Sequence, residues 1–413
     1  MITTINNKHN KLNVPNSTDK GNAIRNLPNL RFPEFREEWE EHELSEYLDF
    51  KNGLNPKPNQ FGKGIKFISV MDILNNAVIT YDCIRASVSV SEEDMSAFSV
   101  QKGDILFQRS SETLEDVGRA NVYVDDIPAV FGGFVIRGKQ KTNYNPLFFK
   151  YLLSSPLARK RIIRMGAGAQ HFNIGQEGLS KVKLPFACID EQNKIAKILY
   201  LLDKRISLQN KIIEDLKKLK SAIIEKLYSE IQGKEYSYRQ LFEIINERNN
   251  RLEFSNVLSA SQERGMVSRE DLNLDIKFER SNINTYKIVR NGDYVIHLRS
   301  FQGGFAFSNI VGVCSPAYTI MRPKDLLEYG YLSYYFTSRQ FIKSLVIVTY
   351  GIRDGRSINV DEWLDMKIVI PTKERQRHIV RTIKVFENRI ENEEMYASCL
   401  LKQKQHLLRQ MFI

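Results

Sequence analysis

The sequence has few cysteines, and their spacing does not suit a metal site. The 413 residues include four, far apart and with no CxxC pair: Cys83, Cys188, Cys314 and Cys399. Such usage is typical of a reducing compartment. No stretch approaches the ~20 apolar residues that a membrane span needs, and the N-terminus lacks an apolar signal segment. We therefore expect a cytoplasmic protein with no metal site and no membrane contact.

Sequence motifs for catalysis are also missing. There is no GxxxxGK[ST] phosphate loop, no glycine-rich S-adenosylmethionine loop after a strand, and no Asn-Pro-Pro-Tyr or Asp-Pro-Pro-Tyr tetrapeptide. Asp104 and Asp293 each follow a glycine just before a strand, where a carboxylate usually shapes the turn. We predict that the chain is not an enzyme and that it holds no catalytic residue and no cofactor of its own.

Acidic residues are absent from three long stretches of a basic chain. The net charge is +11 and the pI is near 9.2, which favours an acidic partner such as nucleic acid. No Asp or Glu occurs at residues 150–176, 294–324 or 329–353. A chain of this length, with 42% hydrophobic residues, is expected to form two or three domains with real cores.

The N-terminal region changes character near Leu27. Residues 1–27 are rich in Asn, Lys, Thr and Ser, and we expect them to be disordered. Two prolines follow, and then an acidic helix is expected near Glu37–Leu48, with Trp39 packing inward.

A long stretch from Lys194 to Tyr228 contains neither Pro nor Gly and has one narrow apolar stripe. Its apolar residues follow alternating steps of three and four, which is typical of a coiled-coil seam rather than a core helix. At ~1.5 Å per residue the helix would be roughly 50 Å long. Its seam consists of Leu199, Leu202, Ile206, Ile213, Leu216, Ile223 and Leu227.

The same pattern returns at the C-terminus. An offset of 184 residues carries Gln192 onto Gln376, and it carries the two polar interruptions Gln209 and Lys220 onto Glu393 and Lys404. Because the interruptions recur in place, we interpret the two segments as an internal duplication. The second seam consists of Ile383, Phe386, Ile390, Ala397, Leu400, Leu407 and Met411.

The regions before the two helices also repeat each other. Lys102-Gly103-Asp104 precedes a strand as Asn291-Gly292-Asp293 does, and Lys181–Pro185 corresponds to Lys367–Pro371. Short alternating strands with a few helices predict two pseudo-symmetric α/β globules. We divide the chain into a tail (1–27), a first globule (28–187), a first helical region (188–232), a second globule (233–371) and a second helical region (372–413).

The polar interruptions favour antiparallel pairing of the two helices. A parallel pair in register would set Lys220 against Lys404, whereas an antiparallel pair places each lysine at an isoleucine level, where its amine can reach water. Mutual burial of the stripes, at about 25 cal/mol per Å², would drive the pairing. The alternatives are that each helix packs on its own globule, or that two chains dimerise through them.

Basic and amide side chains cluster where acidic residues are scarce. Four basic residues share about one and a half turns of helix near residue 160, and the loop after each Gly-Asp strand holds Arg, Ser or Gln. These types suit phosphates and base edges. Our candidates for DNA contact are Arg109, Ser110, Ser111, Arg119, Arg159, Lys160, Arg161, Arg164, Gln170, His171, Arg299, Ser300, Gln302, Arg339, Lys343, Arg353 and Arg356.

The two globules share a frame but differ in nearly every loop side chain. This is what two readers of different short sequences on one scaffold would show. Helices between them would hold the readers a fixed distance apart, so the chain would bind a bipartite DNA target with an unread spacer.

The chain resembles the specificity subunit of type I restriction-modification systems, and the resemblance extends from Leu30–Phe35 to the C-terminus. A Lys-Leu-Pro strand end leads into Glu-Gln and Ile-Ala at the start of a long helix, and the pattern recurs. The first copy is Lys183-Leu184-Pro185, Glu191-Gln192 and Ile195-Ala196; the second is Val369-Ile370-Pro371, Arg375-Gln376 and Ile379-Val380. The second copy departs from the family's Glu-Gln at Arg375.

The resemblance implies two α/β target recognition domains joined by two long antiparallel coiled-coil helices. It also implies that two modification (methyltransferase) subunits dock on this scaffold and methylate adenine, and that restriction (motor-nuclease) subunits add ATP-dependent cleavage. S-adenosylmethionine, ATP and Mg²⁺ would then belong to the partner subunits. The alternatives are a stand-alone DNA methyltransferase or nuclease with a cryptic active site, and a coiled-coil assembly scaffold that does not bind nucleic acid.

Overall fold

The structure is a computed structural model that describes residues 26–168, 171–261, 264–272, 280–297, 304–350 and 357–413. The predicted disordered tail therefore lies almost wholly outside the described residues. The chain forms two compact units: unit 1 is Met1–Ser207 with Cys399–Ile413, and unit 2 is Leu208–Ser398. This division falls within the two long helices rather than at their ends, because opposite ends of each helix pack into different units.

The segment expected to be a helix at Glu37–Leu48 is mostly not helical. It forms β1 (Glu40–Glu43) and a single helical turn, α1 (Leu44–Tyr47). Strand β1 pairs antiparallel with β12 (Lys183–Phe186), which sets the Glu43 carboxylate 3.7 Å from the Lys183 amine. Tertiary pairing thus overrides the helical pattern. The prediction that Trp39 packs inward is confirmed, since this side chain is buried.

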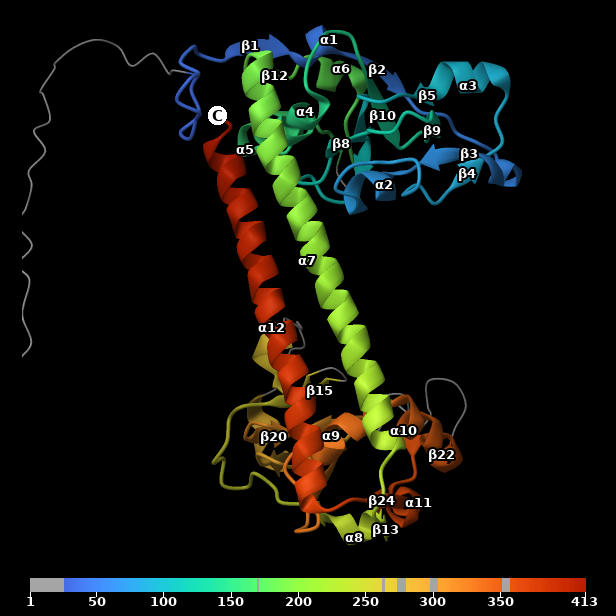
Figure 1. Cartoon of the computed structure of the whole chain (residues 1–413), viewed down its shortest axis with the longest axis vertical. Helices are drawn as coiled ribbons and strands as arrows, with labels where there is room; N and C mark the ends of the chain where they lie inside the picture. The colour runs from blue at the N-terminus through green and yellow to red at the C-terminus, as the bar shows by residue number, and fades with distance from the viewer. Residues whose placement is uncertain (1–25, 169–170, 262–263, 273–279, 298–303, 351–356) are drawn as a thin grey trace, which may run out of the picture. The chain divides into compact units, whose positions relative to one another are not determined.

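Unit 1 is built on two four-stranded sheets (Figure 1). The first is fully antiparallel, and the second contains one parallel pair, β3 with β9. The first sheet runs in the order β2 (Leu48–Asn52), β10 (Val135–Gln140), β6 (Ile105–Gln108) and β8 (Ala120–Val122). The second runs in the order β4 (Ser87–Val88), β3 (Phe61–Ile68), β9 (Ala129–Phe131) and β5 (Ser99–Val100).

The helices of unit 1 begin where the sequence supplies caps. Asn145 accepts hydrogen bonds from the backbone N–H groups at the start of α4, and Ser155 accepts one from Ala158 at the start of α5. Each is followed by a first-turn proline, whose fixed backbone angle suits the start of a helix. The helices are α2 (Val70–Asn75), α3 (Glu92–Phe98), α4 (Pro146–Leu153), α5 (Pro156–Ile163) and α6 (Gln176–Ser180), with a 3-10 turn at Pro58–Gln60.

Unit 2 repeats the first sheet of unit 1. Its four strands have the corresponding order and are again antiparallel: β14 (Phe242–Ile245), β21 (Thr319–Pro323), β18 (Tyr294–Ile296) and β19 (Phe305–Phe307). Strand β13 (Lys234–Ser237) pairs with β24 (Lys367–Ile370) as β1 pairs with β12. The other strands are β15 (Leu258–Ser261), β16 (Gly265–Ser268), β17 (Lys287–Val289), β20 (Gly312–Cys314), β22 (Thr349–Tyr350) and β23 (Ser357–Ile358).

The short helices of unit 2 also correspond to those of unit 1. Ser237 and Gln240 form a capping box at α8, as Glu43 and Glu46 do at α1. The helices are α8 (Tyr238–Leu241), α9 (Tyr331–Tyr335), α10 (Arg339–Ser344) and α11 (Val360–Asp365), with 3-10 turns at Arg269–Leu272, Arg280–Thr285 and Leu345–Val348.

Two buried glutamines make the same contacts in the two units. The Gln192 amide donates to the carbonyl of Ala187 at 2.9 Å, and Gln376 donates to that of Pro371 at 3.0 Å. Each side-chain oxygen also accepts a backbone N–H from a loop of its own unit. Gln192 accepts that of Asn145, just before α4, at 2.9 Å, and Gln376 accepts that of Glu328, shortly before α9, at 2.8 Å. This equivalence supports the duplication that the sequence predicted.

Glu191 precedes Gln192, whereas Arg375 precedes Gln376, and the surroundings of these two residues differ. Glu191 is fully buried and accepts two hydrogen bonds from Arg31, at 2.7 and 2.8 Å, and one from Trp39 at 3.0 Å. Both partners come from the segment before β1, whereas Arg375 is exposed. A buried carboxylate needs such partners, so Glu fits the first copy.

The long helices α7 (Ile189–Ser229) and α12 (Lys373–Gln410) lie side by side in antiparallel directions within each unit (Figure 1). In unit 1, Leu202 and Ile206 form a buried cluster with Leu400. In unit 2, Gln209 lies against Glu393. The predicted antiparallel pairing is confirmed.

Charged contacts along the helix pair obey the same 184-residue offset. Lys404 contacts Asp203 at 2.5 Å, and the offset converts this pair into Lys220 with Glu387, which are in contact at 3.4 Å. The two lysines thus face carboxylates, rather than only isoleucine levels as the sequence suggested.

The helix ends also pack on their own globules. Leu199 belongs to the core of unit 1, and Ile383 belongs to that of unit 2. Near the end of α7, Ile224 and Tyr228 are buried, while the predicted seam residues Ile223 and Leu227 are only partly buried. Each long helix therefore pairs with the other along its length and packs on a globule at its ends.

Candidate DNA interface

The predicted reading loop of unit 1 is a well-bonded structure. Strand β7 (Ser110–Ser111) pairs antiparallel with β11 (Phe172–Asn173), and the Ser110 hydroxyl donates to the Asn173 side-chain oxygen. The N–H of Ile174 donates to the carbonyl of Arg109 at 2.9 Å. The structure thereby brings Arg109, Ser110 and Ser111 together with a segment far along the chain.

Arg109 is fixed against a glycine turn. Its N–H donates to the carbonyl of Phe134 at 2.9 Å, and its guanidinium donates to that of Gly133 at 3.2 Å. The side chain is half-buried, so part of it stays accessible. His171 is exposed just before β11. Gln170, also predicted to contact DNA, lies outside the described residues.

Arg159 and Arg119 hold the loop between β7 and β8. The Arg159 guanidinium donates to the carbonyls of Glu115 and Val117 at 2.8 and 2.7 Å, and burial lowers its pKa to about 10. Arg119 is exposed and pairs with Asp116 at 2.7 Å. Both arginines, predicted to contact DNA, therefore have partners within the protein.

The basic residues of α5 do not share one environment. Arg161 bonds to Glu41 and to the carbonyl of Lys183, which ties α5 to the β1–β12 pair. Lys160 and Arg164 are exposed. The sequence pattern could not separate these roles, because the acidic partner comes from a distant strand.

In unit 2, the described part of the predicted interface is smaller. Arg339 and Lys343 are exposed on α10, and the Arg339 N–H donates to Glu225 at 2.6 Å. The remaining predicted residues lie outside the described ranges: Arg299, Ser300, Gln302, Arg353 and Arg356.

The two Gly-Asp turns have the structural role that was predicted. Asp104 accepts a hydrogen bond from the N–H of Gln101 at 3.0 Å, and Asp293 accepts one from Arg290 at 2.9 Å. Asp293 also binds Arg322 through both carboxylate oxygens, at 2.9 and 3.0 Å. Burial raises the pKa of Asp104. Each carboxylate closes its turn rather than facing a substrate.

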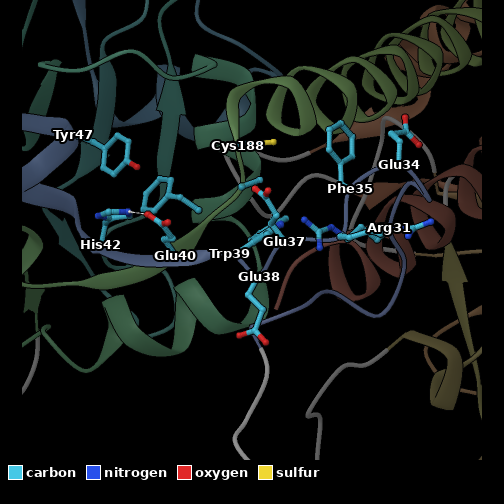
Figure 2. Close-up of a pocket in the computed structure, with 13 residues that line it drawn as sticks. Arg31, Glu34, Phe35, Glu37, Glu38, Trp39, Glu40, His42, Tyr47 and Cys188 are labelled. Carbon is cyan, nitrogen blue, oxygen red and sulfur yellow. Dashed lines mark ion pairs between the residues drawn. The ribbon is translucent and has the colours of Figure 1, made fainter.

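A cavity of about 450 Å³ lies beside the start of α7 (Figure 2). Its lining includes the carboxylates of Glu34, Glu37, Glu38 and Glu40, and His42 lies 3.4 Å from Glu40. Arg31 and Arg36 also line the cavity, but the carboxylates outnumber them, and this balance disfavours phosphate. Within the described residues no group of three or more His, Cys, Asp or Glu side chains is arranged to hold a metal.

Phe134, which the sequence analysis did not single out, is exposed at the turn beside Arg109. An isolated Phe after two glycines gives no periodic signal, and only its exposure distinguishes it from a core residue.

Comparisons with known proteins bear directly on this arrangement. Residues 36–218 match the family described as the type I restriction modification DNA specificity domain. The chain is 24% identical over 410 residues to the protein named as the MjaX type I restriction enzyme specificity subunit of Methanocaldococcus jannaschii, covering 93% of this chain and 95% of that one. The chain is thus similar to type I specificity subunits, and the family match lies over residues 36–218.

Solved structures show the same fold. The type I restriction-modification S subunit from M. genitalium matches with a TM-score of 0.54 at 13% identity, covering 94% of this chain and 99% of that one. A chain from a structure on complex assembly and conformational transition of the type I system matches with a TM-score of 0.56 at 14% identity, covering 91% and 97%.

The matching family is described by DNA specificity, and the relative is named as a specificity subunit. Among the described helices, none has both the length and the apolar character required to cross a bilayer.

Proposed function

We propose that this specificity subunit binds a bipartite DNA target, one half through each unit, with an unread spacer between the halves. The observation that carries the proposal is the repeated sheet order with unlike loops. The β2-β10-β6-β8 sheet recurs as β14-β21-β18-β19, while Arg109-Ser110-Ser111 in the first copy corresponds to Arg299-Ser300-Phe301 in the second. A common frame with different side chains suits two different half-sites.

The long helices are proposed to set the spacer length. Helix α7 runs without a break for 41 residues, and α12 for 38. Matched apolar and charged contacts hold the pair in one register. A continuous helix is stiff along its axis, so its length would fix the distance between two readers.

The outer faces of the same helices are proposed to bind two modification subunits. Leu201 is exposed on α7 in unit 1, and Val385, its counterpart by the 184-residue offset, is exposed on α12 in unit 2. Further apolar side chains are exposed along α7 at helical spacing: Ile198 in unit 1, and Leu208, Ile212 and Leu219 in unit 2. Two related apolar faces suit two copies of one partner.

The chemistry of the complex is then assigned to other chains. S-adenosylmethionine would be bound by the modification subunits, which methylate adenine, and ATP and Mg²⁺ would be used in cleavage by the restriction subunits. The sequence has no phosphate loop, and the described residues include no cluster that could ligate a metal. The missing phosphate loop fits this division of labour.

An exchange of half of the chain tests the proposal. Residues 235–370 are replaced by the equivalent segment of a relative, and the complex is expressed with its modification subunits. Sequencing of methylated bases in the host genome should then show a change in one half of the target only. A reciprocal exchange of residues 28–187 should change the other half. If either exchange alters both halves, or neither, the two-reader proposal is wrong.

A further inference from the structure

Phe134 is exposed in a part of unit 1 where its neighbours are buried. Its side chain is 69% exposed, whereas Phe131 and Val135 on the flanking strands β9 and β10 are completely buried. A turn between two buried strands would normally carry a polar residue here. The exposed ring therefore needs an explanation.

The turn cannot easily move to bury the ring. The N–H of Gly132 donates to the carbonyl of Ile68 at 3.0 Å, and the N–H of Val135 donates back to Gly132 at 2.8 Å. A Cβ atom added at Gly133 would lie 2.0 Å from the side-chain oxygen of Asn55. The backbone is thus packed from both sides, and the ring projects from a fixed base.

The backbone of Phe134 lies beside groups that are suited to DNA. The carbonyl of Phe134 accepts a hydrogen bond from the N–H of Arg109, whose guanidinium binds the adjoining Gly133. Arg109 leads directly into β7, where Ser110 and Ser111 lie beside β11. Positive charge and hydroxyl groups next to an exposed aromatic ring are a combination found where proteins insert side chains into DNA.

A second exposed apolar residue of unit 1 has the opposite surroundings. Ile127 is 52% exposed but directly follows Asp125 and Asp126. Negative charge at that position disfavours phosphate. Ile127 therefore serves as a matched control for Phe134.

We propose that Phe134 inserts its ring into the base stack of the half-site read by unit 1 and partly unstacks one base step. The inference rests on DNA recognition by this subunit. A phenyl ring has no hydrogen-bonding group, so it can gain from bases only by contact with their faces or with apolar groups. The ring would favour steps that unstack easily, such as TA or CA/TG, and so add to specificity.

The test uses the full chain assembled with its modification subunits. Duplexes carry the target, identified from methylated bases, with 2-aminopurine replacing one base at a time along the half-site. Because 2-aminopurine fluoresces more strongly when unstacked, binding of the wild-type complex should raise its emission at one step other than the adenine that the modification subunits flip out for methylation. Phe134→Ala should abolish this rise and weaken target binding by about tenfold to a hundredfold. Phe134→Trp should retain both, and Ile127→Ala should leave both unchanged.

Three results would overturn the inference. The first is no position with increased emission, apart from the methylated adenine, when the wild-type complex binds its target. The second is equal target affinity of Phe134→Ala and Ile127→Ala. The third is loss of modification subunits from the Phe134→Ala complex in size-exclusion chromatography, which would make Phe134 part of a protein interface. Failure of the wild-type complex to bind its target at all would instead argue against the proposed function.

Discussion

A buried ionic cluster in unit 1 links α4 to both long helices. Asp203 on α7 accepts a hydrogen bond from the Tyr151 hydroxyl at 2.9 Å, and its carboxylate also contacts Lys150 at 3.3 Å and Lys404 at 2.5 Å. Burial lowers the pKa of Lys150 to about 8, against the opposing effect of Asp203. The two lysines together keep the pKa of Asp203 below its usual value, although burial alone would raise it.

The lowered pKa of Lys150 predicts a pH dependence of stability. Below pH 8 the native state bears the full cost of a buried ammonium group. Between pH 8 and 10.5 the native lysine loses its proton while the unfolded one keeps it, so the free energy of unfolding rises with pH. From pH 7.5 to 9.5, wild type should gain about 1–2 kcal/mol relative to Lys150→Met. Urea denaturation at both values measures this, and parallel profiles would contradict it.

At the residue scale, the sequence showed where basic side chains cluster but not which groups they bind. Arg159 and Arg161 looked like free cations because no acid lies near them in the sequence. In the structure, Arg159 binds the carbonyls of Glu115 and Val117, and Arg161 binds Glu41. Such partners come from distant segments, and only the fold brings them near. Whether the remaining candidates contact DNA stays a prediction.

At the element scale, the long helices were predictable and the short strands less so. The stripe from Leu199 to Leu227 has a period that only a paired helix satisfies, and the recurrence of its polar interruptions showed where its partner lies. Strand β1 was mistaken for helix because its run of glutamates has high helix propensity. Its pairing with β12 depends on residues far along the chain, at Lys183–Phe186.

The two related ion pairs of the helices should differ in strength. Asp203 and Lys404 have side-chain exposures of 7% and 26%, whereas Lys220 and Glu387 have 29% and 38%. Less solvent means less screening, so Asp203 with Lys404 should show a coupling energy of about 1–3 kcal/mol and the other pair about 0.5 kcal/mol or less.

Double-mutant cycles on the free energy of unfolding measure these couplings. The substitutions are Asp203→Asn with Lys404→Met, and Lys220→Met with Glu387→Gln. Equal coupling at the two positions would show that burial does not control the strength of these contacts.

At the scale of the whole molecule, duplication carried most of the prediction. The patterns of the two globules were each weak, but each supported the other. Gln192 and Gln376 make equivalent contacts in the two units. The exposed Phe134 and the buried role of Glu191 were not predictable, because a single Phe or Glu has no pattern to mark it.

If the helices set the spacer, lengthening both should lengthen the spacer. One heptad inserted after Gln209 in α7 and one after Glu393 in α12 adds about 10 Å and keeps the seam in phase. The methylated target should then gain about three base pairs of spacer, with both half-sites unchanged. Methylome sequencing gives the readout. Insertion into α7 alone, as the control, should impair assembly because the seams no longer match. An unchanged spacer in the double insertion would refute the proposal.

The contact between Gln209 and Glu393 has a consequence for the origin of the chain. The 184-residue offset converts this pair into itself, because Gln209 becomes position 393. In a symmetric dimer of half-length chains this residue would meet its own copy, and a glutamate there would face a glutamate. The ion pairs Asp203 with Lys404 and Glu387 with Lys220 are related by the offset and obey the symmetry of such a dimer. The pair of Gln209 with Glu393 does not, because its two residues differ. In a single polypeptide the two positions of this pair are separate residues, so the central position need not be its own partner.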